Sequence, residues 1–117
     1  RPPLFQRVVA RIHDVNTVNN GGRTALMFAA CNNQLDVVIS LMNHPRIDLN
    51  VQDRDFNRTA LHCAVINNHP AIVSQLLSDD KMDASLKDKY NRTALKYAIV
   101  YGHAECVTIL RQHGAPE

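Results

Sequence analysis

Arg23-Thr24-Ala25-Leu26 is the stretch that decides the fold, because the same four residues return at positions 58–61 and 92–95. Successive copies are 35 and 34 residues apart. A unit of this length is too small to bury an apolar face by itself, so similar units stack on one another to form a continuous core. The period therefore predicts a solenoid of stacked repeats, and such a solenoid favours surface recognition over catalysis.

Each unit carries the pattern of two short helices. An alanine follows each motif leucine by three positions, and an apolar pair begins thirteen residues after each motif threonine, at Val37, Ile72 and Cys106. We expect the motif threonines to cap the first helix, because their hydroxyl can accept from free backbone N–H groups; they are Thr24, Thr59 and Thr93. Asn and Gly reach the left-handed conformation at low cost, so the first helices are expected to end near Asn33, Asn68 and Gly102.

This order of elements resembles the ankyrin repeat. The third unit is the clearest, with Thr93-Ala94-Leu95-Lys96-Tyr97-Ala98, then Gly102-His103-Ala104-Glu105, then His113-Gly114-Ala115. The resemblance covers the chain from about residue 4 to the end, and it implies an all-α solenoid of helix-turn-helix units joined by β-hairpin-like loops. We expect a single ankyrin-repeat domain over 1–117, divided into a half repeat at 4–23, repeats at 24–58 and 59–92, and a terminal repeat at 93–117.

Two motif positions depart from the family pattern. Met27 and Lys96 stand where the family prefers histidine, so only His62 is expected to hydrogen-bond the neighbouring loop. The hairpin segment 54–58 is one residue longer than the family's usual length.

The ends of the chain suggest a part of a longer or processed protein. Segment 4–12 has the apolar pattern of the second helix of an incomplete leading unit, and the chain begins Arg-Pro-Pro without an initiator Met. Arg111 replaces an apolar residue of the earlier units, which either marks the last repeat or lets a long side chain extend its charge to solvent.

Composition narrows the class of protein. The net charge of +2 is too small to suggest a polyanion, so no nucleic-acid partner is expected. No apolar run is long enough to span a bilayer, so no membrane insertion is expected. The odd number of cysteines, at unrelated repeat positions, predicts reduced thiols in a cytoplasmic or nuclear protein; they are Cys31, Cys63 and Cys106. The isolated domain is expected to be monomeric.

No motif predicts chemistry. Cys-x-x-Cys and His-x-x-x-His spacings are absent, so we expect no metal, no cofactor and no enzymatic activity. His103, Glu105 and Cys106 resemble a base and a nucleophile, but Gly-His-x-Glu is the family's ordinary turn into its second helix.

Four asparagines match modification patterns. Those at 57 and 91 begin Asn-x-Thr glycosylation acceptors, for which we favour a structural role because no secretion signal is present. Those at 16 and 50 resemble the family's asparagines that can be hydroxylated, and this alternative stays open.

The candidate binding surface consists of side chains that the fold does not require. Two aromatics lie at the hairpin tips, where they are either exposed or packed over the neighbouring hairpin. Arginines precede the capping threonines, and apolar or amide side chains end the first helices. The expected partner-binding residues are Phe56, Tyr90, Tyr101, Ile66, Val100, Asn67, Arg58 and Arg92.

These observations predict a protein–protein interaction module, such as a scaffold or adaptor. One alternative is a regulatory or substrate-recruiting segment of a larger enzyme, channel or ubiquitin ligase, and another is an inhibitor of a signalling protein. Nucleic-acid binding would require the hairpin arginines together with Lys87, Lys89 and Lys96. The acidic residues among them, Asp53, Asp55 and Asp88, are expected to dilute that positive field.

Overall fold

The computed structural model describes residues 14–117, and this part is all-α, with six helices and no strand. The helices alternate between a first and a second helix of each repeat. They are α2 (Ala25–Cys31), α3 (Leu35–Met42), α4 (Ala60–Ile66), α5 (Pro70–Leu77), α6 (Ala94–Tyr101) and α7 (Ala104–Gln112). The helix expected at 4–12 lies outside the described residues.

The motif threonines cap the first helices, as expected. The hydroxyl oxygens of Thr24, Thr59 and Thr93 accept from the backbone N–H groups three residues further on, at 3.3, 3.3 and 3.2 Å. Each threonine has an extended backbone, so the helix begins at the alanine that follows it. The prediction of three equivalent helix starts is confirmed.

Left-handed residues end the first helices. Asn33, Asn68 and Gly102 have φ of 56°, 57° and 70°. The N–H of the next residue then donates to the carbonyl of the alanine that follows the motif leucine by three positions, at 3.0, 2.9 and 2.9 Å, which satisfies a carbonyl at the helix end. The chain therefore reverses direction and the second helix of each repeat packs against the first.

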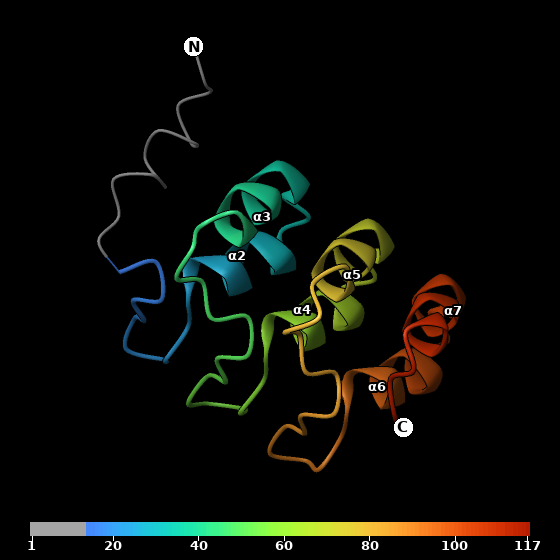
Figure 1. Ribbon diagram of the computed structural model, residues 1–117. Helices are drawn as coiled ribbons and strands as arrows, with labels where there is room; N and C mark the ends of the chain where they lie inside the picture. Colours follow the sequence, from blue (N-terminus) through green and yellow to red (C-terminus); the bar gives the residue numbers. More distant parts are fainter. Residues whose placement is uncertain (1–13) are drawn as a thin grey trace.

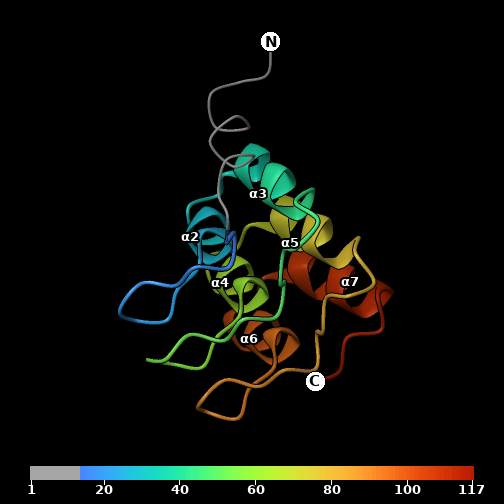
Figure 2. The ribbon, with the colours of Figure 1, turned by 60° about the vertical axis from the view of Figure 1, so that its left-hand side comes forward.

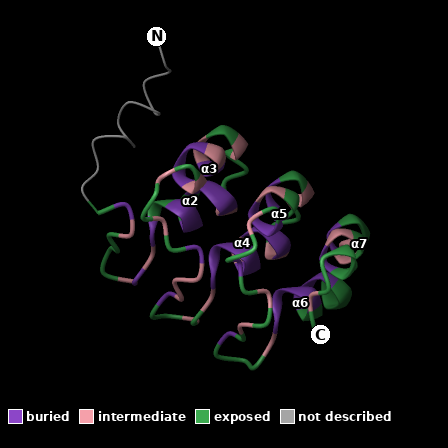
Figure 3. Cartoon of the chain, in the orientation of Figure 1, coloured by how far each residue is buried: buried purple, intermediate pink, exposed green. Residues whose placement is uncertain are grey.

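The helix pairs stack into two rows (Figure 1). Helix α4 packs between α2 and α6, and α5 packs between α3 and α7. The apolar core lies between the rows, where the burial is greatest (Figure 3). The motif leucines Leu26, Leu61 and Leu95 fill it, and each is at most 2% exposed.

The connecting loops project to one side of the stack and fan out next to the first helices (Figure 2). Gly22, Asn57 and Asn91 occupy equivalent left-handed positions, with φ of 75°, 57° and 63°. Position 22 also requires glycine for a steric reason, because a Cβ there would lie 2.9 Å from the Arg54 backbone nitrogen. The two asparagines thus serve the loop conformation, which agrees with the structural role favoured for these Asn-x-Thr sequences.

Two further asparagines join successive loops. The Asn16 amide donates to the Arg46 carbonyl at 2.8 Å and accepts from the Asp48 N–H at 2.7 Å. Asn50 makes the same pair of bonds to Lys81 and Asp83, both at 2.8 Å. Their side-chain amides therefore have a structural use in the stack.

None of the helices within residues 14–117 has the length and apolar character needed to cross a bilayer.

Candidate protein-binding surface

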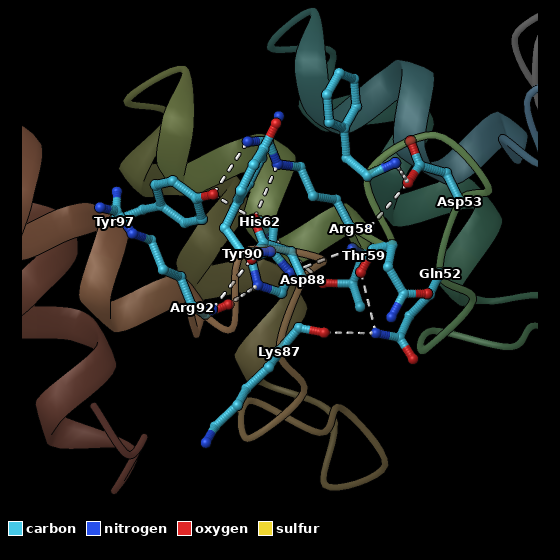
Figure 4. A network of polar contacts seen from close by, with 12 residues as sticks. Gln52, Asp53, Arg58, Thr59, His62, Lys87, Asp88, Tyr90, Arg92 and Tyr97 are labelled. Atoms are coloured by element: carbon cyan, nitrogen blue, oxygen red, sulfur yellow. Dashed lines mark hydrogen bonds and ion pairs between the residues drawn. The ribbon is translucent and has the colours of Figure 1, made fainter.

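The contact between the α4 and α6 repeats, here called the α4–α6 boundary, is organised around the buried carboxylate of Asp88 (Figure 4). Its Oδ1 accepts from the backbone N–H groups of Tyr90 and Arg92, at 2.9 and 3.1 Å. Its Oδ2 lies 3.3 Å from Arg58 Nε and accepts from the Tyr97 hydroxyl. Arg58 Nη2 also donates to that hydroxyl oxygen at 3.1 Å. One carboxylate therefore holds a hairpin and ties two repeats together.

The charge states of this network follow from its contacts. Burial raises the pKa of Asp88, but hydrogen bonds from Tyr97 and the hairpin backbone outweigh it, so the pKa lies below its usual 3.8. Burial, assisted by the neighbouring carboxylate, raises the pKa of Tyr97. At neutral pH the carboxylate is ionised and the phenol keeps its proton, which is the arrangement that the hydrogen bonds require.

His62 makes the second link across this boundary. Its Nε2 lies 3.0 Å from the Arg92 carbonyl, while Nδ1 lies 3.2 Å from the Thr59 backbone nitrogen. The expected bond from this histidine to the neighbouring loop is thereby confirmed. Burial lowers the pKa of His62 below 6.5, so the ring is neutral at pH 7.

The corresponding contact between the α2 and α4 repeats, the α2–α4 boundary, has a weaker network. Arg23 Nε lies 3.5 Å from Asp53 Oδ2, and Arg23 Nη2 lies 3.8 Å from Asp55 Oδ2. Met27 occupies the place equivalent to His62, and Cys63 occupies the place equivalent to Tyr97. Neither side chain can make the bonds of its counterpart.

A cavity of about 340 Å³ opens at the α2–α4 boundary. Apolar side chains form much of its wall, and the arginines of two successive repeats lie at it. The lining residues are Arg23, Met27, Phe28, Cys31, Asn32, Asp53, Phe56, Arg58, Cys63, Ile66 and Asn67.

Two cysteines meet in this cavity, although they stand at unrelated repeat positions. A hydrogen bond from the Cys63 thiol lowers the pKa of Cys31 from 9.0 to about 7, and Arg23 adds to the effect against the opposing influence of burial. The same contact, together with burial, raises the pKa of Cys63. Cys106 is buried on α7, and burial raises its pKa. Sequence reasoning missed the pair because it compared equivalent positions, whereas the last turn of α2 meets the middle of α4.

Three of the predicted binding residues are exposed as expected. The exposed fractions are 55% for Tyr90, 49% for Val100 and 50% for Tyr101. Ile66 is half-buried and Asn67 is exposed, and both line the α2–α4 cavity. Phe28 was not predicted, yet it is 45% exposed at the same cavity. Its place on the inner side of a first helix was the available signal.

Phe56 is not freely exposed at its hairpin tip. Its ring is half-buried, with the Arg58 guanidinium 4.7 Å and Lys89 Nζ 5.5 Å from the ring centroid. The Tyr90 ring lies 6.5 Å away on the next hairpin. Of the two alternatives for the tip aromatics, Phe56 therefore takes the packed one, because cations and a neighbouring aromatic attract its ring to the adjacent loop.

A family model for ankyrin repeats, in three copies, matches residues 3–53 and 45–116. The chain belongs to the ankyrin-repeat family. Ankyrin repeats are in general protein–protein interaction modules, and they typically serve recognition rather than catalysis. Among residues 14–117 of this ankyrin domain, no group of histidine, cysteine and carboxylate side chains is arranged to hold a metal ion.

The predicted arginines take part in the ankyrin stack itself. Arg58 is bound by Asp88 and Tyr97, and its guanidinium also lies 5.2 Å from the Tyr97 ring centroid. The Arg92 guanidinium lies 5.4 Å from the same ring centroid. Arg58 thus stabilises the stack, and it would have to keep these bonds in any contact with a partner. The assignment of Arg58 and Arg92 to a partner stays a prediction.

The third hairpin is more basic than the sequence suggests. Lys87, Lys89 and Lys96 are exposed, and Arg92 lies among them. Asp88 is buried and paired with Arg58, so its negative charge is directed inward. Asp88 therefore does not lie among the exposed charges of this hairpin, and the expected dilution of the positive field stays a prediction because the buried carboxylate keeps its charge.

Proposed function

We propose that this ankyrin domain is a scaffold or adaptor that binds a protein partner through its hairpin tips and the inner face of its first helices. One observation carries the proposal: three large apolar side chains, Tyr90, Val100 and Tyr101, are each about half exposed. The equivalent of Tyr101 is asparagine in both earlier repeats, so the stack does not need an aromatic there. Half-exposed aromatics are the residues that most often dominate interface energies.

The exposed side chains connect to one another across the inner face. The Tyr101 ring lies 5.8 Å from the Tyr97 ring, which contacts Arg58. Arg58 in turn lies over Phe56, whose ring is next to Tyr90. Tyr97 itself is buried, so a partner would meet Tyr101, Tyr90 and the half-buried Arg58 and Phe56, and aromatic and arginine side chains are enriched at interfaces.

The basic third hairpin supports a partner with acidic as well as apolar side chains. Lys87 and Lys96 lie in the same depression as Tyr90 and Arg92. Complementary charge would speed association and orient the partner, while the aromatics would supply most of the affinity.

The test begins with affinity purification and mass spectrometry to identify partners, followed by binding measurements on the purified pair. Tyr101→Ala and Tyr90→Ala are each expected to weaken binding by about 2 kcal/mol, as hot-spot residues do. Gln112→Ala, at an exposed position on the outer helix α7, is the matched control and should leave affinity unchanged. Changes below about 0.5 kcal/mol for both tyrosines would contradict the assignment.

Our proposal extends to a monomeric domain in the cytoplasm or nucleus, acting alone, as a regulatory or recruiting segment of a larger protein, or as an inhibitor. We also propose that it has no nucleic-acid partner. A nucleic acid whose binding falls steeply with added salt would contradict this, since such a slope reports phosphate contacts.

A further inference from the structure

The two repeat boundaries share an arginine–aspartate pair and the hairpin bonds of that aspartate. Arg23 and Asp53 correspond to Arg58 and Asp88, with Nε to Oδ2 distances of 3.5 and 3.3 Å. Both carboxylates also accept from two hairpin N–H groups through Oδ1. The difference lies in the side chains at positions 27 and 63, which are Met and Cys where the next repeat boundary has His62 and Tyr97.

Tyr97 shows what this kind of boundary accommodates. Its ring lies between the Arg58 and Arg92 guanidinium groups, with carbon Cζ to centroid distances of 5.2 and 5.4 Å. Its hydroxyl accepts from Arg58 and donates to Asp88. The arginine pair, the carboxylate and the apolar wall thus form a complete set of contacts for a phenol.

The α2–α4 cavity is lined by an equivalent arginine pair, carboxylate and apolar wall, with cysteine in place of the tyrosine. Arg23, Arg58 and Asp53 line it, and they are the counterparts of Arg58, Arg92 and Asp88. Cys63 lies at the sequence position equivalent to Tyr97 in the next repeat, and its short side chain borders the cavity of about 340 Å³. This volume is at the lower end of the range for small-ligand sites, which begins at roughly 300 Å³.

We propose that the α2–α4 cavity is a socket for a tyrosine side chain of the protein partner, whose hydroxyl binds between Arg23 and Asp53. The inference rests on the proposed function and names the chemistry of one contact. A leucine side chain would offer the Arg23 guanidinium no aromatic face, and a phenylalanine would offer the Arg23–Asp53 pair no hydroxyl. A phosphotyrosine would bring its charge against Asp53 and Asp55 and is therefore disfavoured.

The test uses N-acetyltyrosinamide as the probe on the full chain, with binding followed by NMR titration. Saturable shifts are expected for Met27, Ile66 and Asn67, with a dissociation constant in the low millimolar range. The phenylalanine analogue should bind at least about tenfold more weakly, because it cannot satisfy the polar pair. O-phosphotyrosine and N-acetylleucinamide should not bind detectably.

Two variants connect the signal to the cavity. Cys63→Tyr should abolish probe binding, because the new ring fills the socket from within. Cys106→Ser, on the buried α7 cysteine, is the control and should bind as the unmodified protein does. A second readout needs no variant: the probe should slow alkylation of Cys31 and leave that of Cys106 unchanged.

Absence of saturable binding, equal binding of the phenylalanine analogue, or unchanged binding in Cys63→Tyr would each overturn the proposal. If Cys63→Tyr fails to fold, the ranking of the probes and the protection of Cys31 decide the question. The proposed function fails separately, because its test uses Tyr90 and Tyr101, which do not line the cavity.

Discussion

The α2–α4 and α4–α6 boundaries join successive repeats of one sequence pattern, yet only the second is closed by a hydrogen-bonded network. Asp88 there binds Arg58 and Tyr97, while Asp53 at the first boundary binds Arg23 alone among side chains. A cavity remains in place of the phenol. The difference teaches that the same arginine–aspartate pair is joined into a network where tyrosine follows the capping threonine by four positions, and borders a cavity where cysteine stands there.

The largest effect is expected from removing the two carboxylates. Asp88→Ala leaves Arg58 Nε and two hairpin N–H groups without an acceptor and removes the acceptor of the Tyr97 hydroxyl proton, and should lower the free energy of unfolding by about 3 kcal/mol. Asp53→Ala should cost about 2 kcal/mol, because it has one side-chain partner fewer.

Urea-induced unfolding measures both, with Asp80→Ala as the exposed control that should change stability by less than about 0.5 kcal/mol. Equal losses at positions 53 and 88 would mean that the tyrosine adds nothing to the second boundary.

The next largest loss of stability is expected from placing the methionine of the α2–α4 boundary at the equivalent position of the α4–α6 boundary. His62→Met removes the bonds to the Arg92 carbonyl and the Thr59 N–H, and should lower the free energy of unfolding by about 1.5 kcal/mol at pH 7. Burial lowers the pKa of His62 in the folded protein below 6.5, so the unfolded chain binds its proton more readily. The contribution of the neutral ring is therefore complete above pH 6.5 and decreases as the pH falls below it.

Unfolding curves between about pH 5 and pH 8 should show the stability difference between the unmodified protein and His62→Met shrinking toward acid. His113→Ala replaces an exposed histidine, and its free energy of unfolding should fall toward acid pH as that of the unmodified protein does. An unchanged difference across this range would contradict the lowered pKa.

A smaller effect, a gain of stability, is expected from placing the tyrosine of the α4–α6 boundary at the equivalent position of the α2–α4 boundary. Cys63→Tyr should fill the α2–α4 cavity and bond the Arg23–Asp53 pair, which raises the free energy of unfolding by about 1 kcal/mol. Cys63→Phe is the matched control that fills the cavity without a hydroxyl, and should gain less. Thermal unfolding measures both, and destabilisation by the tyrosine would show that the two boundaries are not equivalent.

The smallest effect concerns reactivity and leaves stability unchanged. Because the thiolate is the reactive form, alkylation of Cys31 by iodoacetamide should rise with pH with a midpoint at about 7. Cys63→Ala removes the hydrogen bond and should move the midpoint toward 9.0. Mass spectrometry of peptides gives each rate, with buried Cys106 as the slow internal control. A midpoint that does not respond to Cys63→Ala would exclude the contact between the two thiols.

Local features of the fold were predictable because their causes are local. Thr24, Thr59 and Thr93 bond the N–H three residues ahead, and Asn33 and Asn68 adopt the left-handed conformation within their own turn. The resemblance to ankyrin repeats added the link from His62 to the next loop. Each of these follows from residue type and spacing along the chain.

The candidate site was only partly predictable. Tyr90, Val100 and Tyr101 are exposed because they occupy positions that the stack does not cover. Phe56 is half-buried because Arg58, Lys89 and Tyr90 lie around its ring, and two of these belong to another hairpin. A local pattern cannot show whether a neighbouring loop covers a side chain.

The sequence by itself determined the repeat, the helix starts and ends, and the family. The period can be read directly along the chain, and a capping residue bonds groups only a few residues away. Only the tertiary structure decided that Asp88 turns inward to Arg58 and Tyr97, that Cys31 meets Cys63, and that a cavity opens at the α2–α4 boundary. The contacts from Asp88 to Arg58 and from Cys31 to Cys63 join residues about 30 positions apart, and their geometry depends on how one helix packs on the next.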